Sequence, residues 1–587
     1  MKHICYFYIF DFRSIHNLGI SLDARYTYDM DEDQKVLTIN RNPKYIEGFW
    51  PEGISSLSAI VGNNGAGKTT FLETMLSVLS GGSRKGLMDT IIVYEDGSGN
   101  VGAYKSVQSY QILYEGKVIG NSTLHPTVPT AKPFYYTSVF RPFSTVHTPG
   151  EGEIGDAYNA SDTWRLIQDL QEYAIDEAKK KEIAILDYFD AYKAQDNNRI
   201  VQLLCDKELR SYLPSNALPK YVIIVPNESG VKIIKKRGVR YFVDPYVNSR
   251  NVHTKEGYVS RIVHNIFCNI EAEYSNKDHT IEETVREKWQ RVYDDTDKIS
   301  EKLESFKKVV PKYTDRINDI KIVVDFLLYS CAYNKNADTL YIDLEQSDSK
   351  DVQELIVLFQ KTNFKVARYF DLRYSRDLTG QTQLSAGELD VLKLCSRLYD
   401  AILLHPSRRE GRLEPYLILI DEAENSYHPE WQRCFVKMLL NFLNALHQRV
   451  KKKRAFQIVL TTHSPILLSD IPRMCINYLE KNEEGKVVQS KMQPETFGSN
   501  VFELYKHAFF MENGLVGAFA YDKIKEIKQT IEQKQNLTDE DIKDLTNRID
   551  LIGDDAIKHY LLSLLEQKYK SNMLEYYKRK IEELKEV

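Results

Sequence analysis

Cysteines are few in this sequence, and none are paired at the spacing that binds zinc. The seven cysteines lie far apart along 587 residues, with no C-x-x-C pair. This spacing argues against a zinc site or a disulfide framework, and for reduced, mostly buried thiols in a cytoplasmic protein. No apolar run approaches the roughly 18 residues that span a membrane, so no membrane partner is expected. The aromatic run Ile4–Phe10 ends at Asp11 and predicts a first strand, not a signal peptide.

The sequence also lacks a marked excess of either charge. Its 78 Lys+Arg and 83 Asp+Glu give a net charge of −5. The overall charge therefore does not indicate a nucleic-acid partner, and any site that binds nucleic acid must be a local patch of basic residues. The candidates are basic clusters at 232–240 and 451–454, although a charge run is more often a solvated face. Direct contact with DNA or RNA is left open.

One phosphate-binding motif is complete. It consists of Gly62, Asn63, Asn64, Gly65, Ala66, Gly67, Lys68 and Thr69, with Thr70 opening the next helix. The apolar run Leu57–Val61 predicts a strand that feeds this P-loop, and 70–79 predicts an amphipathic helix that leaves it. Backbone N–H groups of such a loop hold phosphate oxygens. Lys68 would reach the β- and γ-phosphates, and the Thr69 hydroxyl would ligate Mg²⁺. The alternative, a Gly-rich turn with a solvated lysine, fits this strand-to-helix context less well, so the sequence predicts ATP and Mg²⁺ as ligands.

A second motif, Leu384-Ser385-Ala386-Gly387-Glu388, opens a helical pattern. It resembles the signature of the ABC-type ATPases, Leu-Ser-Gly-Gly-Gln or a close variant. The resemblance implies that Ser385 and Gly387 bind the γ-phosphate held by the opposite subunit of a dimer. A structural alternative is a capping box in which Ser385 and Glu388 close a helix N-terminus. Both can hold together, because a helix N-terminus is itself an anion site.

Two apolar runs, Tyr416–Ile420 and Phe456–Leu460, predict parallel strands buried on both faces. The first ends in Asp421 and Glu422, at the edge where α/β sheets place ligands. In the Walker B role, Asp421 would hold Mg²⁺ and Glu422 would polarise the attacking water. The second leads to His463, the position of the switch histidine in ABC ATPases.

Three further phrases narrow the resemblance to the RecF, OLD and SMC branch of soluble ABC ATPases. They are the Glu-Asn-x-x-His-Pro stretch at 424–429, Thr-Thr-His-Ser-Pro at 461–465 and the opening 10–18. One element of that family is missing. The run Phe134–Arg141 stands where a Q-loop glutamine is expected, and it contains none. Ser138 or a neighbour substitutes, or the metal is held without it.

Four regions are expected from these motifs and from periodicity. Charge-rich helical patterns at 163–213 and 282–328, with short strands at 221–225 and 239–243, indicate an insertion in the head. No heptad pattern is sustained for long, so a compact lid or short arm is favoured over a long coiled coil. The fold class is α/β: an ABC-type head with a mixed sheet, a helical insertion and a helical C-terminal extension. The boundaries are 1–145 for the N-lobe with Walker A, 146–375 for the insertion, 376–480 for the C-lobe and 481–587 for the extension.

The C-terminal region resembles that of the PtuA-type ATPase subunits of anti-phage Septu and retron systems. The shared phrases are Thr-Phe-Gly-x-Asn at 496–500 and Phe-Phe-x-x-x-Gly at 509–514. The resemblance implies an ATP-hydrolysing homodimer or higher oligomer that regulates a separate nuclease subunit. No acidic set of a Toprim domain and no His-Asn-His set is present, so nuclease activity is not expected in this chain. The main alternative is a RecF-like DNA-repair or chromosome ATPase that binds DNA directly. A chain that is itself a nuclease, or a transport or ribosome-acting ABC protein, fits less well.

Overall fold

The computed structural model describes most of the chain and divides it into two compact units. These are Met1–Phe509 and Phe510–Val587, and each is described by itself. The described residues are 3–79, 89–96, 98–119, 132–138, 158–161, 186–226, 253–274, 299–309, 314–345, 350–362, 369–404, 416–450, 455–490, 494–508, 516–534 and 537–585. Among these residues, no helix is both long enough and apolar enough to cross a bilayer.

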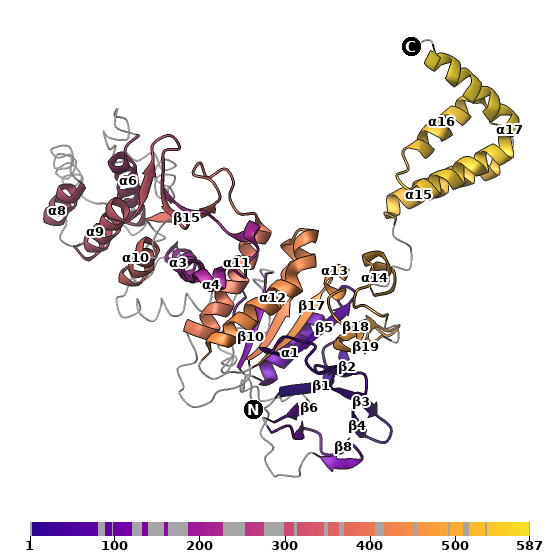
Figure 1. Cartoon of the computed structure of the whole chain (residues 1–587), viewed down its shortest axis with the longest axis horizontal. Coiled ribbons are helices and arrows are strands. Elements are labelled where there is room, and N and C mark those ends of the chain that lie inside the picture. Colours follow the sequence, from indigo (N-terminus) through magenta and orange to yellow (C-terminus); the bar gives the residue numbers. More distant parts are fainter. Residues whose placement is uncertain are drawn as a thin grey trace. The chain divides into compact units, whose positions relative to one another are not determined.

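An eleven-stranded mixed sheet forms the centre of the first unit, in the order β11-β10-β16-β17-β5-β18-β19-β2-β1-β6-β7 (Figure 1). The first six strands in this order run parallel to one another, and they carry the predicted nucleotide motifs. Their bounds are β11 Tyr158–Asn159, β10 Lys132–Thr137, β16 Tyr416–Asp421, β17 Phe456–Thr462, β5 Ile54–Gly62 and β18 Ile476–Lys481. This is the expected P-loop ATPase head: a mixed sheet with helices on its faces and helical parts attached.

The two faces of the parallel half bury alternate residues of each strand. Ile60, Leu419 and Val459 contribute to the core that includes helix α1 (Lys68–Leu79). Ile418 and Leu460 contribute to the core on the other face. That core includes side chains of α11 (Ala386–Tyr399) and α12 (Pro429–Arg449). Burial on both faces explains why these strands are continuous apolar runs in the sequence.

The other half of the sheet is mainly antiparallel and carries a second, smaller sheet. Aromatic and aliphatic side chains on one face of β1, including Tyr6 and Tyr8, pack with Leu37, Ile39 and Ile112 of the smaller sheet. The smaller sheet has the order β3-β4-β8-β9. The bounds of both groups are β19 Val487–Gln489, β2 Ile15–Ser21, β1 His3–Phe12, β6 Thr90–Glu95, β7 Val101–Lys105, β3 Tyr26–Asp31, β4 Val36–Arg41, β8 Gln111–Tyr114 and β9 Lys117–Ile119.

The inserted segment combines helices with a four-stranded sheet of order β13-β14-β12-β15. The sequence predicted strand β12 and helices in the regions of α3, α4, α8 and α9. It did not predict helices α6 and α10 or strands β13, β14 and β15. The expected strand 239–243 lies outside the described residues. The elements are α3 Leu186–Cys205, α4 Lys207–Arg210, η2 Ser215–Ala217, β12 Tyr221–Pro226, α6 Lys255–Tyr274, α8 Ile299–Val309, α9 Thr314–Tyr329, β13 Ala332–Asn334, β14 Thr339–Asp343, α10 Lys350–Lys361 and β15 Phe370–Ser375.

A buried ion pair joins this insertion to the head. Arg397 on α11 is 0% exposed, and its guanidinium donates to Asp196 Oδ1 on α3 at 3.1 and 3.0 Å. It also donates to the Ala160 carbonyl at 2.6 Å. Burial opposes ionisation of Asp196, but the Arg397 charge prevails and lowers the pKa of that carboxyl. The helix that begins at the signature motif is thus tied to the insertion.

The remaining elements are short segments of the first unit and the helices of the second. In the first unit a π-helical turn, Asp400–Leu404, follows α11, and the other segments are η7 Ala423–Ser426, α13 Pro465–Leu468, η8 Arg473–Cys475 and α14 Val501–Ala508. The second unit contains α15 Ala518–Gln533, α16 Asp539–Asp550 and α17 Asp555–Lys585. Leu545, Leu561 and Leu565 are part of its apolar core. This core is small and separate, as expected for a helical extension.

Candidate nucleotide site

The P-loop lies between β5 and α1, as the sequence predicted. Gly65 and Gly67 have φ of 77° and 80°, a region that glycine occupies without steric cost. A Cβ at Gly62 would lie 2.2 Å from the Leu479 carbonyl oxygen, so only glycine fits there. Asn63, Asn64 and Gly65 are exposed at the tip, whereas Ala66 is buried. The loop is therefore shaped by its glycines and open to solvent.

Lys68 lies beneath this loop and is almost fully buried. Its Nζ donates to the carbonyl oxygens of Gly62 at 3.0 Å and Asn63 at 3.4 Å. Burial lowers the pKa of Lys68, and the nearby carboxylates of Glu422 and Asp421 oppose that effect. A desolvated lysine held among carbonyl oxygens at a P-loop is well placed to donate its hydrogen bonds to phosphate oxygens.

Asp421 ends β16 directly beside Thr69. Thr69 Oγ1 lies 3.1 and 3.0 Å from the two carboxylate oxygens of Asp421, which is 0% exposed. Thr461 Oγ1 donates to the same carboxylate at 2.5 Å, and Tyr135 Oη donates to it at 3.3 Å. A hydroxyl and a carboxylate meeting at a P-loop form the hard oxygen set that suits Mg²⁺. The residues present therefore fit the predicted metal.

Glu422 follows Asp421 in a strained backbone conformation. Its φ of 50° and ψ of 43° are left-handed, which costs a non-glycine residue free energy and is frequent at functional sites. Its Oε1 lies 3.1 Å from Nε2 of His463, and its Oε2 accepts a hydrogen bond from Asn425 at 3.1 Å. These contacts, His463 first, lower the pKa of Glu422 to about 2. Glu422 is thus an ionised carboxylate at neutral pH, aimed at the switch histidine.

The side chains of Lys68 and Glu422 both approach the same atom of His463. Nε2 of His463 lies 2.7 Å from Lys68 Nζ as well as 3.1 Å from Glu422 Oε1. One ring nitrogen either accepts from the lysine or donates to the carboxylate, so it serves one partner at a time. Lys68, Glu422 and His463 therefore converge on a point where a γ-phosphate would offer oxygen acceptors to Lys68 Nζ and to His463 Nε2.

Glu424 was not predicted as a site residue, although it lies under the switch histidine. It is 2% exposed, and its Oε1 accepts hydrogen bonds from the Thr462 hydroxyl and from the His463 backbone N–H. Burial raises the pKa of Glu424. Gln432 donates to the Glu424 carbonyl at 3.4 Å and accepts from Ser464 at 2.7 Å. Glu424 is a positioning residue for His463, and its place two residues after Glu422 was the available signal.

The strand β10 contributes two side chains where a Q-loop glutamine was missing. Tyr135 reaches Asp421, as above, and Ser138 Oγ donates to the Glu422 carbonyl at 3.4 Å. Both contacts attach β10 to the Walker B end of β16, its parallel neighbour. Of the predicted run, residues 139–141 lie outside the described part of the chain.

The signature residues Ser385 and Gly387 start α11. Ser385 forms the capping box: its N–H donates to Glu388 Oε2 at 2.7 Å, and the Glu388 N–H donates to Ser385 Oγ at 3.4 Å. A serine hydroxyl that accepts a bond still has its own proton to donate, and Ser385 is exposed. A Cβ at Gly387 would lie 2.5 Å from the Ser426 carbonyl oxygen, so this glycine is required for close packing. These contacts hold the signature near its own Walker B turn and leave its N-terminus facing solvent.

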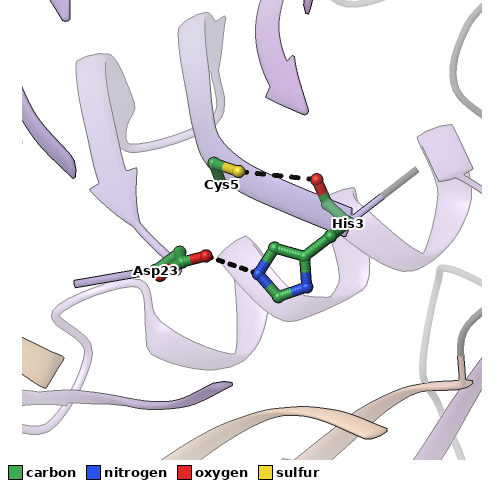
Figure 2. A group of neighbouring side chains, drawn as sticks. All are labelled: His3, Cys5 and Asp23. Carbon is green, nitrogen blue, oxygen red and sulfur yellow. Dashed lines mark hydrogen bonds and ion pairs between the residues drawn. The ribbon is translucent and has the colours of Figure 1, made fainter. Parts of the chain in front are cut away.

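Another cluster with metal-ligand chemistry lies away from this site. His3, Cys5 and Asp23 have their ligand atoms within 4.8 Å of one another (Figure 2). Asp23 pairs with His3 Nε2 at 2.7 Å, and Arg25 also donates to it through Nε at 2.8 Å. Burial, with the nearby Asp23 charge, raises the pKa of the Cys5 thiol. A carboxylate already paired with a guanidinium beside a protonated thiol is a buried ion-pair network that fixes β1, and it does not suit a cation.

The predicted basic clusters cannot be placed on this framework. Residues 232–240 and 451–454 lie outside the described residues. His428, from the family phrase, is the N-cap of α12, and its Nδ1 accepts from the Glu430 N–H at 3.3 Å. That is a structural role, favoured by Pro429 at the first helical position.

Known proteins share the central part of this arrangement. Residues 273–469 match the family model described as "AAA domain, putative AbiEii toxin, Type IV TA system". The chain is 27% identical over 176 residues to "Retron Vc95 probable ATPase" of Vibrio cholerae serotype O1 biovar El Tor. That match covers 29% of this chain and 31% of the relative. Residues 273–469 are thus similar to an AAA-type ATPase domain. This similarity and the geometry of the P-loop together support nucleotide binding.

Other similarities are more distant. Protein ea59 of Escherichia phage lambda is 29% identical over 131 residues, 22% of this chain and 21% of that protein. The matches thus span between about a fifth and a third of these relatives. An Smc head domain with a coiled coil and joint from Pyrococcus yayanosii aligns with 86% of this ATPase and 100% of its own chain, at 11% identity and a TM-score of 0.24. An Smc head bound to the C-winged helix domain of ScpA aligns with 83% and 97%, at 11% identity and a TM-score of 0.21. The fold is assigned from the strand order described above, not from these superpositions.

Proposed function

We propose that this ATPase hydrolyses ATP as a head-to-tail dimer and thereby controls a separate nuclease in an anti-phage defence system. The observation that carries the proposal is the meeting of Lys68, Glu422 and His463 at one point, beside the Thr69–Asp421 pair. These residues come from three segments that are distant in the chain, the start of α1, the end of β16 and the end of β17, and together they would make a site for a triphosphate with its attacking water.

The roles follow from the contacts. Lys68 would move from the carbonyls of Gly62 and Asn63 to phosphate oxygens, and Thr69 with Asp421 would hold Mg²⁺. When bound, that ion neutralises charge on the phosphates. His463 would donate to the γ-phosphate. Glu422 would accept a hydrogen bond from the water once His463 has turned to the phosphate, because its carboxylate is ionised at neutral pH.

Dimerisation is proposed because the exposed α11 N-terminus is available to a second subunit. The Ser385 hydroxyl and the backbone N–H groups at Ala386 and Gly387 form an anion site of the helix-terminus kind. In a head-to-tail dimer each subunit would close the other's site. Closure on ATP and opening on hydrolysis would then make a two-state switch.

The nuclease partner is proposed from the retron ATPase relative and the C-terminal phrases, since the sequence predicts no nuclease set in this chain. The second candidate is a RecF-like ATPase that binds DNA directly. The SMC/RecF-like head favours it equally, because both candidates use the same nucleotide site.

The first experiment is Glu422→Gln in the full chain. Removal of the water-polarising carboxylate should lower ATP turnover on the order of 100-fold while ATP binding persists. The dimer should then accumulate with ATP, as seen by light scattering after size exclusion. Glu430→Gln is the matched control, because Glu430 is exposed and pairs with Arg433. Unchanged turnover and an unchanged response of the dimer to ATP would contradict the proposed switch.

The partner is tested by affinity purification of the tagged chain from its host with mass spectrometry. A stoichiometric nuclease would support the defence function. Repair proteins, or the chain alone with DNA, would favour the RecF-like candidate.

A further inference from the structure

Helix α17 has two apolar faces, and only one of them is covered in its unit. Leu561 and Leu565, both 0% exposed, face the core shared with α15 and α16. Farther along, Arg579 reaches Asp539 at the start of α16 at 3.3 Å. On a helix of 3.6 residues per turn, position 579 is about five turns beyond position 561, so the two positions lie on the same face. The ion pair therefore indicates that this face of α17 is turned toward the start of α16 at position 579.

The opposite face of the last turns carries an apolar stripe. We define the stripe as Leu574, Tyr577, Ile581 and Leu584, whose exposed fractions are 60%, 38%, 54% and 72%. Successive members are three, four and three residues apart, the a and d spacing of a heptad. On a helix these positions fall on one side, roughly opposite to Leu561 and Arg579. The spacing is that of a seam for another helix.

Lysines border this stripe on both sides. Lys578 and Lys585 occupy the e positions of the heptad, and Lys580 occupies the g position. Lys578 and Lys585 are exposed, and Lys580 is partly exposed. The acidic residues of these turns lie away from the seam, with Glu575 and Glu582 at b and Glu583 at c. A partner helix would therefore meet an apolar seam with positive charge along both edges.

The charge pattern selects the occupant. In a parallel pair of two α17 helices, the g position meets the e position of the partner, so Lys580 would face a lysine. In an antiparallel pair, e meets e and g meets g, and lysines again face lysines. Like charges at these positions disfavour a second copy of the chain. They favour a helix that carries Asp or Glu at its own e and g positions.

Other exposed apolar residues of this unit lie outside the stripe. Lys523 lies over the Phe519 ring at 6.0 Å, and Lys528 lies over the Tyr560 ring at 5.6 Å, so each of these rings has a lysine against it. Leu551, although 86% exposed, follows α16 and has no neighbours at heptad spacing.

We propose that the stripe on α17 docks an acidic amphipathic helix of a partner protein. The seam supplies the apolar burial, and the flanking lysines select the partner by charge. The inference concerns α17 alone, and it stands whether or not the partner is a nuclease and whether or not the head hydrolyses ATP.

The test uses the full chain and two synthetic helical peptides as probes. Both peptides have leucine at a and d over three heptads; one has glutamate at e and g, and the other has lysine there. Binding is followed by fluorescence anisotropy at low and high salt. The acidic peptide should bind at least about tenfold more tightly than the basic one, and salt should reduce the difference.

Three variants make the test specific to the stripe. Ile581→Asp with Leu584→Asp should abolish binding of the acidic peptide. Lys578→Glu with Lys585→Glu should reverse the preference between the two peptides. Leu551→Asp, an exposed apolar position outside the stripe, should change neither. Circular dichroism and basal ATP turnover should stay at the level of the unmodified chain in all three, because these side chains lie outside the core and the nucleotide site.

The proposal is overturned by any of three results. One is equal binding of both peptides, or binding that the stripe variants leave intact. Another is self-association of the chain that Ile581→Asp with Leu584→Asp removes, which would make a second copy the occupant. The third is stripe-dependent sedimentation with vesicles of anionic lipid, which would make the stripe a membrane-binding face.

Discussion

The head and the end of α17 place side chains in opposite environments. In the head, charged groups are buried and paired: Arg397 with Asp196, and Asp421 with the hydroxyls of Thr69 and Thr461. At the end of α17, apolar groups such as Leu584 are exposed. Burying a charge is costly unless it is paired, whereas exposing a leucine forgoes only its hydrophobic burial. The comparison shows that the head offsets the cost of its buried charges by pairing them, while α17 has exposed apolar surface that a partner could cover.

The largest effect is expected from breaking the buried pair. Arg397→Met removes the guanidinium and leaves Asp196 buried beside Arg199, whose Nη1 is 3.5 Å away. Loss of one partner from a buried pair costs about 3–5 kcal/mol of unfolding free energy. Urea unfolding monitors this loss, and the double variant Arg397→Met, Asp196→Leu should recover much of it. Arg548→Met, in an exposed ion pair, is the control and should leave the midpoint unchanged. If Arg397→Met shifted the urea midpoint as little as Arg548→Met, the expected difference between the buried and the exposed ion pair would be wrong.

The next effect concerns activity. Lys68→Ala removes the buried cation of the P-loop, so ATP turnover should fall by about 10²–10³-fold. Measured ATP affinity should fall as well, because Lys68 would contact the phosphates in the ground state. Lys523→Ala in α15 removes a lysine from the second unit and should leave turnover unaltered. Turnover that survives Lys68→Ala would show that the charged groups of the head serve structure alone.

The two faces of α17 provide a contrast within one helix. Leu565→Ala empties a fully buried site and should lower the stability of the second unit by about 2–5 kcal/mol. Leu584→Ala, the same substitution on the exposed stripe, should change it by less than about 0.5 kcal/mol. Thermal unfolding of the pair monitors both. Equal losses would mean that the stripe is already covered within the chain.

The smallest effect is expected from acid. The pKa of Glu422 is about 2, against an ordinary value of 4.5. A carboxyl with a depressed pKa stabilises the fold above its unfolded pKa, and this contribution is lost as the pH falls from about 4.5 toward 2. Unfolding free energy measured across this window should decline less steeply in Glu422→Gln, which has no such proton to gain. Parallel curves for the two proteins would show that His463 and Asn425 do not hold this carboxylate.

The strands and helices around the nucleotide site could be predicted because their signals are local. Runs such as 57–61 and 456–460 are apolar at four of five positions, since both faces of a parallel strand are covered. The helix after Ser385 carries its own cap in the sequence. The strands β13, β14 and β15 could not be predicted in this way. They are three to six residues long, and they form one sheet because β12, from a distant part of the chain, pairs with β14 and β15, while β13 pairs with β14.

By itself, the sequence determined the chemistry available to this protein: a phosphate loop, a Walker B pair, a signature and a histidine, each specified by short-range pattern. Only the tertiary structure decided which of these side chains meet. Lys68 and His463 are far apart in the chain, yet parallel β5 and β17 end at one edge and bring their atoms to 2.7 Å. The structure alone also showed Glu424 under the histidine and the second apolar face of α17. Burial and contact depend on what packs against a residue, and that is fixed by pairings between segments that no local pattern encodes.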